Sequence, residues 1–158
     1  MDQTSFPVSI IMEKRPSVSR WADAYWTVIG IIVGEQAATE RTLLRTQDDI
    51  EQYLYPGFSV QLFKDECESY YHNMVSPKPG CYVITDNEDS EEPKPIKVSM
   101  SFDEAHAYQE GGKEVYPVEI PAEIYGWMEA FVIDNYFPEK KFKRKLKNWK
   151  KDGGNIKA

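Results

Sequence analysis

Apolar and polar residues alternate strictly between positions 96 and 102. The apolar members are Ile96, Val98, Met100 and Phe102, and the polar residues between them are Lys97, Ser99 and Ser101. Successive side chains of a β-strand point to opposite faces, so this pattern predicts a strand with one buried and one solvated face. The chain is therefore expected to build a sheet that is covered on one side.

Six further segments rich in β-branched and aromatic residues also predict strands, and from these segments we expect a sheet of about six strands. They cover residues 6–13, 25–34, 58–66, 67–76, 81–87 and 114–121. Gly30 predicts a bulge or a close backbone approach, and Pro117 predicts that the last strand lies on an edge or at a bulge. Residues 35–49 are expected to form a loop or a short irregular segment.

Two helices are predicted in the second half of the chain. Asp103 is expected to cap a short helix over residues 104–110, which Gly111 ends. Pro121 suits the first turn of an amphipathic helix that stops before Pro138. The apolar stripe of this second helix consists of Ile124, Trp127, Met128, Phe131 and Val132.

These elements predict an α+β fold. We expect a mainly antiparallel sheet or partly closed barrel of about six strands, with a C-terminal amphipathic helix and a basic terminal helix. A chain of 158 residues fits one domain. Residues 1–139 are expected to form that single α+β domain, and residues 140–158 the basic C-terminal helix and tail.

Charge is distributed unevenly along the chain. The net charge is −7, yet residues 140–158 carry nine Lys or Arg against one acid, which leaves ten basic and 25 acidic residues elsewhere. A basic tail on an acidic body suits either contact with that body or an acidic partner. The acidic body argues against nucleic acid as a partner, because each phosphate contact needs a cation without an opposing field nearby.

The sequence gives no support for several classes of protein. The chain has no apolar run of about 18 residues and no secretory signal, and its two cysteines suit a reducing compartment, so a cytoplasmic location is expected. Cys67, His72, Cys81 and His106 lack the paired spacing of metal ligands, so no metal or other cofactor is predicted. Phosphate-binding glycine loops and the G-x-S-x-G motif are missing. We therefore predict no catalytic residues and no enzymatic activity.

Two segments near the ends carry a resemblance to a known family. They are "MEKRPSVSRWADAYWTVIGIIVG", with Glu13, Arg15, Arg20, Trp21 and Trp26, and "EVYPVEIPAEIYGWMEAFVIDNYFPEKKFKRKLK". The chain resembles an uncharacterised bacterial domain of unknown function that is often encoded beside formate dehydrogenase subunits. The resemblance implies an accessory or assembly role for a molybdenum- or tungsten-containing formate dehydrogenase.

The Arg20, Trp21 and Trp26 group is the first candidate for a partner-binding site. Trp and Arg are enriched among the residues that dominate interface energies, and an Arg over an indole adds about 0.5–2 kcal/mol. The alternative is a hairpin whose indoles pack on the sheet while Arg20 pairs with Asp23 or Glu13.

The basic segment is the second candidate, through Lys141, Lys143, Arg144 and Lys145. On a helix, Phe142, Leu146 and Trp149 fall at i, i+4 and i+7, an apolar stripe surrounded by cations. The alternative is a terminal helix that packs this stripe on the body and leaves its charges solvated.

A different class of function stays open beside protein binding. A barrel mouth lined by Tyr70, Tyr82, Trp26 and Trp127 would suit a small ligand or cofactor, since aromatic-lined cavities of about 300–1,000 Å³ hold such molecules.

Overall fold

The computed structural model describes residues 4–17, 24–87 and 92–137. Within these ranges the chain forms seven strands, three α-helices and a single 3-10 turn. The elements are β1 (Ser5–Pro16), β2 (Ala24–Val33), β3 (Thr42–Gln47), β4 (Ile50–Gln61), η1 (Lys64–Glu66), α1 (Cys67–Val75), β5 (Cys81–Asp86), β6 (Lys94–Ser99), α2 (Phe102–Glu110), β7 (Glu114–Val118) and α3 (Ala122–Asn135).

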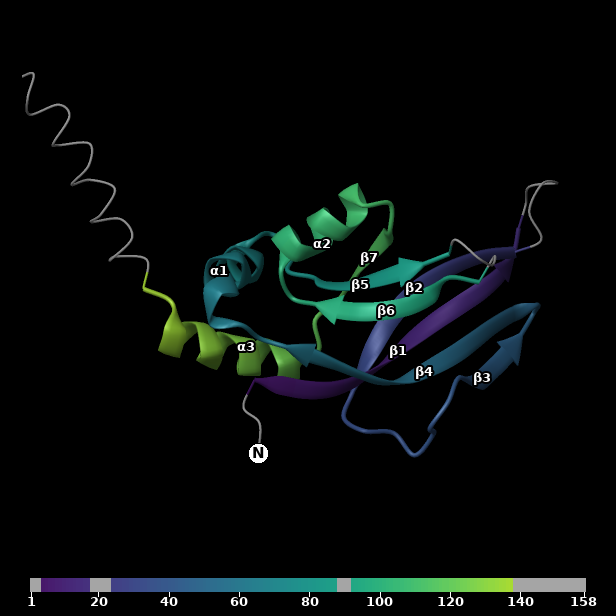
Figure 1. The fold of residues 1–158 in the computed structure, drawn as a ribbon. Helices are drawn as coiled ribbons and strands as arrows, with labels where there is room; N and C mark the ends of the chain where they lie inside the picture. Colours follow the sequence, from purple (N-terminus) through teal and green to yellow (C-terminus); the bar gives the residue numbers. More distant parts are fainter. Residues whose placement is uncertain (1–3, 18–23, 88–91, 138–158) are drawn as a thin grey trace, which may run out of the picture.

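The strands form a mixed sheet that curls into a nearly closed barrel (Figure 1). Its order is β2-β1-β4-β6-β5-β7, with β3 paired to β4 off this path. Within the described residues, β4 and β6 run parallel and pair at Val60 and Val98, while the other neighbours are antiparallel. The strands at the two ends of the path, β2 and β7, come into contact. The α+β class is confirmed, whereas the expectation of a mainly antiparallel sheet missed the parallel pair.

Two bulges bend the long strands. In β2, Ile29 is the extra residue, because Gly30 pairs with Ile11 and Val28 with Met12. The bulge predicted from Gly30 therefore lies beside that glycine. In β4, the register of the β1 pairing shifts around Gly57, whose φ of +89° is one that glycine adopts without strain.

Two segment predictions were wrong. Residues 67–76 form helix α1 rather than a strand: Cys67, Tyr70 and Asn73 recur every three residues and are buried, a helical period that the β-favouring tyrosines concealed. The segment 35–49 contains strand β3, and β4 begins at Ile50, eight residues before the predicted start at Phe58. The secondary structure of such short segments depends more on pairing with distant elements than on local composition.

Ser101, not Asp103, caps helix α2. The Ser101 hydroxyl accepts a 3.0 Å hydrogen bond from the backbone N–H of Glu104, three residues on. Strand β6 accordingly stops at Ser99, and Phe102, predicted as the last buried residue of the strand, begins the helix with 55% of its surface exposed.

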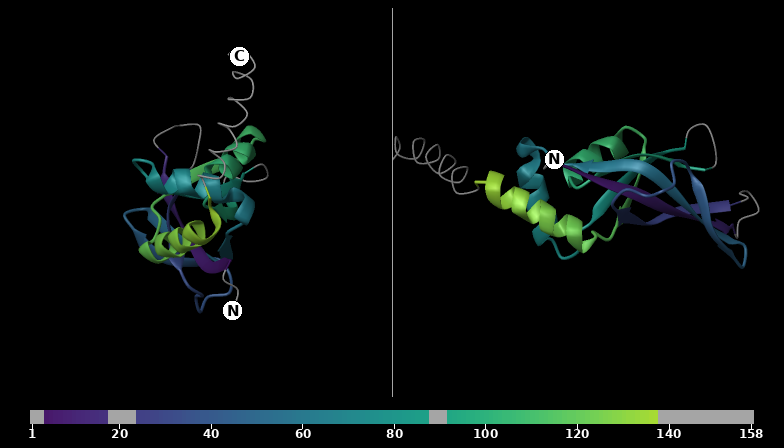
Figure 2. Two further views of the ribbon diagram at one scale, coloured as in Figure 1. Left: turned by 90° about the vertical axis from the view of Figure 1, so that its left-hand side faces the viewer. Right: turned by 90° about the horizontal axis from the view of Figure 1, so that it is seen from below.

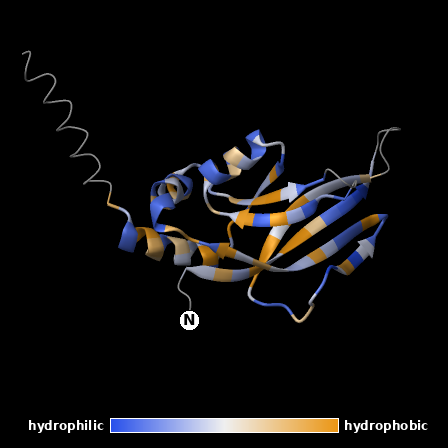
Figure 3. Cartoon of the chain, viewed as in Figure 1, coloured by the Kyte–Doolittle hydropathy of each residue, from blue (hydrophilic) through white to orange (hydrophobic). Residues whose placement is uncertain are grey.

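Helix α3 lies against the sheet and α1, at one end of the molecule (Figure 2). Ile124, Met128 and Val132 are buried, and the ring of Trp127 packs on Phe6 of β1 with centroids 5.3 Å apart. Hydrophobic and hydrophilic residues alternate along the strands (Figure 3), so one side of the sheet supplies the core. In the described part of the chain, no helix is both long and apolar enough to cross a membrane.

Candidate binding site at the barrel mouth

At the end of the barrel away from α1 and α3, strands β1, β3 and β5 end and strands β2, β4 and β6 begin (Figure 1). We call this end the barrel mouth. Six side chains gather there, and we call them the mouth cluster: Lys14, Trp26, Arg41, Tyr53, Tyr55 and Glu92.

Strand register places the aromatic members of this cluster on the core side of the sheet. Tyr53 pairs with Met12, and Tyr55 pairs with Ile10, two positions earlier in β1. Met12 and Ile10 are completely buried, and side chains directly opposite each other share a face. By the same rule, Trp26 shares a face of the sheet with Lys14, the residue that it pairs with on β1. The mouth cluster therefore continues the hydrophobic core outward to the rim.

Arg41 is the best-anchored member of the cluster. Its guanidinium lies 3.9 Å from the centroid of the Tyr53 ring. Two hydrogen bonds hold it to the carboxylate of Glu92, from Nε at 2.6 Å and from Nη2 at 2.9 Å. Burial opposes the charge, but the hydrogen bonds to Tyr55 and Glu92 outweigh it and raise the pKa of Arg41. The guanidinium is thus a fixed, permanently charged plane over an aromatic ring.

Tyr55 holds Glu92 at the barrel mouth through a hydrogen bond. Its hydroxyl donates to the Glu92 carboxylate, and burial together with that acceptor raises the pKa of Tyr55. Glu92 precedes β6, and within the described residues β4 and β6 share one pairing position. Side chains rather than backbone hydrogen bonds therefore bridge β4 and β6 at the mouth.

Trp26, a predicted partner-binding residue, is half-buried in this cluster. Its ring lies 5.7 Å from that of Tyr53, centroid to centroid, and Lys14 Nζ lies 5.8 Å from the centroid of the indole. The indole therefore packs on the sheet, as the hairpin alternative expected, and it also takes part in a cation–π contact at the rim.

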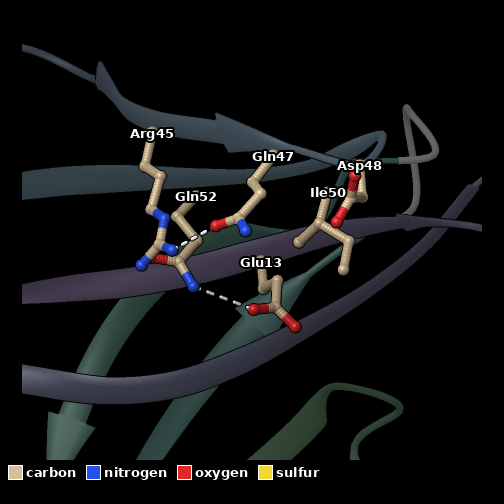
Figure 4. A pocket seen from close by; sticks show the side chains of 6 residues that line it. All are labelled: Glu13, Arg45, Gln47, Asp48, Ile50 and Gln52. Carbon is tan, nitrogen blue, oxygen red and sulfur yellow. Dashed lines mark hydrogen bonds between the residues drawn. The ribbon is translucent and has the colours of Figure 1, made fainter.

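The opposite face of the same strands holds a small pocket of about 230 Å³ (Figure 4). At its base the side chain of Glu13 is 9% exposed, and its carboxylate accepts hydrogen bonds from Gln52 Nε2 at 3.0 Å and Arg15 Nε at 2.5 Å. These two bonds, that of Gln52 foremost, lower the pKa of Glu13 despite its burial. Arg45 and Gln47 of β3 hydrogen-bond to each other at the rim. Each of these donors and acceptors already has a partner, which suits a structural network.

The other predicted partner-binding residues lie outside the described part of the chain. They are Arg20, Trp21, Lys141, Lys143, Arg144 and Lys145. Arg20 and Trp21 belong to the connection between Pro16 and Ala24, which pair with each other at the tip of β1 and β2.

The four aromatic residues considered for a ligand pocket have separate surroundings. Tyr70 is 2% exposed and its ring packs on Phe131, whereas Tyr82 packs on Phe102. Trp127 and Trp26 pack on Phe6 and Tyr53, respectively. Among the ring contacts of the described residues, no two of the four predicted aromatics pair with each other.

The cysteines and histidines also lie apart. Cys67 and Cys81 are free and buried, and burial raises the pKa of the Cys81 thiol to about 12. His72 and His106 are exposed beside Glu68 and Glu110, each one helical turn away. Over residues 4–17, 24–87 and 92–137, no three His, Cys, Asp or Glu side chains form a group that could hold a metal ion.

Five members of the mouth cluster, all except Trp26, were missed in the sequence. Tyr53 and Tyr55 follow the alternation of a strand, with Leu54 between them, and could have been found by extending β4 backwards. Arg41 and Glu92 are 51 residues apart, and no local pattern connects them.

The fold and the site define an α+β protein with a nearly closed mixed sheet and an aromatic, cationic cluster at the mouth of its barrel. The family model "Protein of unknown function (DUF3305)" matches residues 7–145, and the chain belongs to this family. We found no curated protein and no solved structure that matches it. The resemblance to an uncharacterised domain family is thereby confirmed.

Proposed function

We propose that the protein is a non-enzymatic accessory or assembly factor that binds another protein through its barrel mouth. The observation that carries this proposal is Arg41, held by Glu92 at 2.6 Å and by the Tyr53 ring at 3.9 Å. Trp, Tyr and Arg are the residue types that dominate interface energies, and all three meet here. Arg20 and Trp21, which lie between β1 and β2 in the sequence, would add a second Arg and a second indole.

Pre-ordering supports a binding role over a purely structural one. A flexible arginine loses about 0.5–1.5 kcal/mol of side-chain freedom when a partner immobilises it. Because Glu92 already restrains Arg41 in the folded protein, most of this side-chain entropy is lost during folding and little more is lost on binding. The basic segment with Lys141, Lys143, Arg144 and Lys145 would speed encounter with an acidic partner surface.

A formate dehydrogenase subunit is the partner we propose to test first, because the family resemblance points to it. Tagged protein would be purified from a host that expresses the formate dehydrogenase subunits, and their recovery would be quantified for wild type, Arg41→Ala and Trp26→Ala. We expect each variant to weaken capture by about tenfold or more, the effect of losing one interface anchor.

Arg45→Ala is the matched control for this experiment. Arg45 lies on the strand that follows Arg41, but it hydrogen-bonds only to Gln47 among the contacts described and lines the opposite face. It should capture the subunit as wild type does. Equal recovery by the Arg41→Ala variant, or no subunit recovered with folded wild type, would contradict the proposal.

A second candidate is binding of a small ligand or cofactor. A cavity of about 570 Å³ lies between the strand bends of β1 and β4 and the connection that follows β2, a size that suits such a molecule. Its walls include Ser9, Pro56 and Phe58. A thermal-shift screen with pterins and nucleotides tests it: a ligand at 100 times its dissociation constant adds about 2.7 kcal/mol of stability. An unchanged melting temperature with every compound counts against this candidate.

A further inference from the structure

The end of the molecule opposite the barrel mouth carries an apolar surface on two helices. We call it the helix-end patch: Tyr71 and Val75 of α1, and Ile133 and Phe137 at the end of α3, with exposed fractions of 38%, 59%, 71% and 63%. The ring of Tyr71 contacts that of Tyr136 at 5.2 Å between centroids, which joins the two helices at this surface. Exposed apolar groupings of this kind usually mark a docking surface.

The charges of these two helices have one sign. Glu68, Glu123, Glu129 and Asp134 lie on α1 and α3, and neither helix contains a Lys or Arg. Asp134 stands in the last turn of α3, where the carbonyl ends of the helix already favour a cation, and that turn has no basic residue. The two helices that carry the patch are therefore acidic, and the last turn of α3 lacks the cation that its helix end favours.

The chain itself supplies a segment of matching chemistry directly after this surface. Residues 140–158 carry nine Lys or Arg and one acid. Phe142, Leu146 and Trp149 are spaced to share one face of a helix, with cations around them. Phe142 follows Phe137 by five positions, a stretch of chain that can span at most about 17 Å, enough to bring the stripe back to the patch. The family match also continues past α3 to residue 145, into this segment.

We propose that the helix-end patch is covered by the basic C-terminal segment of the same chain. Phe142, Leu146 and Trp149 pack on Tyr71, Val75, Ile133 and Phe137, and the lysines meet the acids of α1 and α3. This arrangement leaves the remaining cations facing outward in a fixed position. The inference does not depend on the proposed function at the barrel mouth.

Hydroxyl-radical footprinting of the full chain tests this contact, because it measures the exposure of individual side chains. In wild type, we expect Tyr71, Ile133 and Phe137 to be oxidised more slowly than their exposed surface implies, relative to Tyr25, which is 58% exposed. Leu146→Asp should abolish this protection. Asn148→Asp introduces the same charge between stripe positions and should keep it.

Two outcomes would overturn the inference. Equal oxidation of the patch in wild type and in Leu146→Asp would mean that the segment does not cover it. Protection that disappears when wild type is diluted would mean that a second copy, and not the same chain, supplies the cover. Variant Val75→Asp gives an independent check from the other side, since it should increase oxidation of Trp149.

Discussion

Glu13 shows how a single carboxylate is kept charged inside a sheet. It is buried, and its oxygens accept hydrogen bonds from Gln52 and Arg15, which lower its pKa. A carboxylate with a lowered pKa stabilises the fold fully above its ordinary titration range. That stabilisation is lost as the pH falls through the lowered pKa.

We expect Glu13→Gln to reduce the free energy of unfolding by about 1 kcal/mol at pH 7, because an amide replaces one charged acceptor. The difference from wild type should shrink as the pH falls from the ordinary titration range of a Glu, about 4.3, and should vanish only below the lowered pKa of Glu13, where the folded carboxylate is itself protonated. Urea titrations of both proteins between about pH 3 and pH 7 measure it. A difference that stays constant over this range would show that the charge of Glu13 contributes nothing.

At the scale of single elements, the tight β3–β4 turn stores backbone strain. Gln47 pairs with Ile50, so Asp48 and Asp49 form a two-residue loop, and both have positive φ values, 53° and 67°. Turns of this kind favour Asn followed by Gly. Asp tolerates the left-handed region better than most residues, yet it still carries a steric cost there.

The double substitution Asp48→Asn with Asp49→Gly should raise the free energy of unfolding by about 1 kcal/mol, because the new pair adopts positive φ more readily. Thermal unfolding of the double variant against wild type measures this gain. A lower melting temperature would mean that the two carboxylates stabilise the turn in a way that the backbone geometry does not account for.

Gly57 provides the opposite test on β4. Its φ is +89°, and a Cβ built there meets no atom within 4 Å, so any cost of a side chain comes from the backbone and not from a clash. Gly57→Ala should therefore destabilise the protein by about 1–2 kcal/mol. Gly126→Ala, in the middle of α3 and with similarly open space, should instead stabilise it by about 0.5–1 kcal/mol. Chemical unfolding of the two variants side by side measures both signs.

The sequence predicted elements whose pattern is local and missed those that depend on distant partners. The β-branched and aromatic composition of 81–87 and the stripe of α3 are internal to their segments, so β5 and α3 were found. Segment 67–76 was mistaken for a strand, because its paired tyrosines favour β-structure while its burial follows a helix. Strand β3 has five exposed residues out of six and exists because β4 pairs with it.

At the level of the whole molecule, β4 and β6 have the least extensive pairing of any neighbouring strands in the described sheet. One residue pair, Val60 with Val98, joins these strands, whereas β1 pairs along most of its length with both neighbours. Long-range parallel pairing leaves no local trace in a sequence, which explains why the parallel β4–β6 pair was not predicted.

Amide hydrogen-exchange rates under native conditions should therefore differ between β1 and β6. We expect the amides of Ile10, Ile11 and Met12 to exchange only through global unfolding, because β1 is enclosed by two strands. Amides of β6 that face β4 should exchange faster, through local opening. Equal protection of both sets would show that the Tyr55–Glu92–Arg41 contacts close the β4–β6 boundary as firmly as a backbone ladder.

The contact between Phe6 and Trp127 has a consequence for synthesis on the ribosome. The first strand is made early, yet the helix that shields its inner face emerges more than one hundred residues later. Until then the side chains of Val8, Ile10 and Met12 are not yet fully buried in the nascent chain. Intermediates with exposed apolar surface of this kind are prone to aggregation and bind chaperones. Folding of this barrel is thus expected to finish only after α3 has been synthesised.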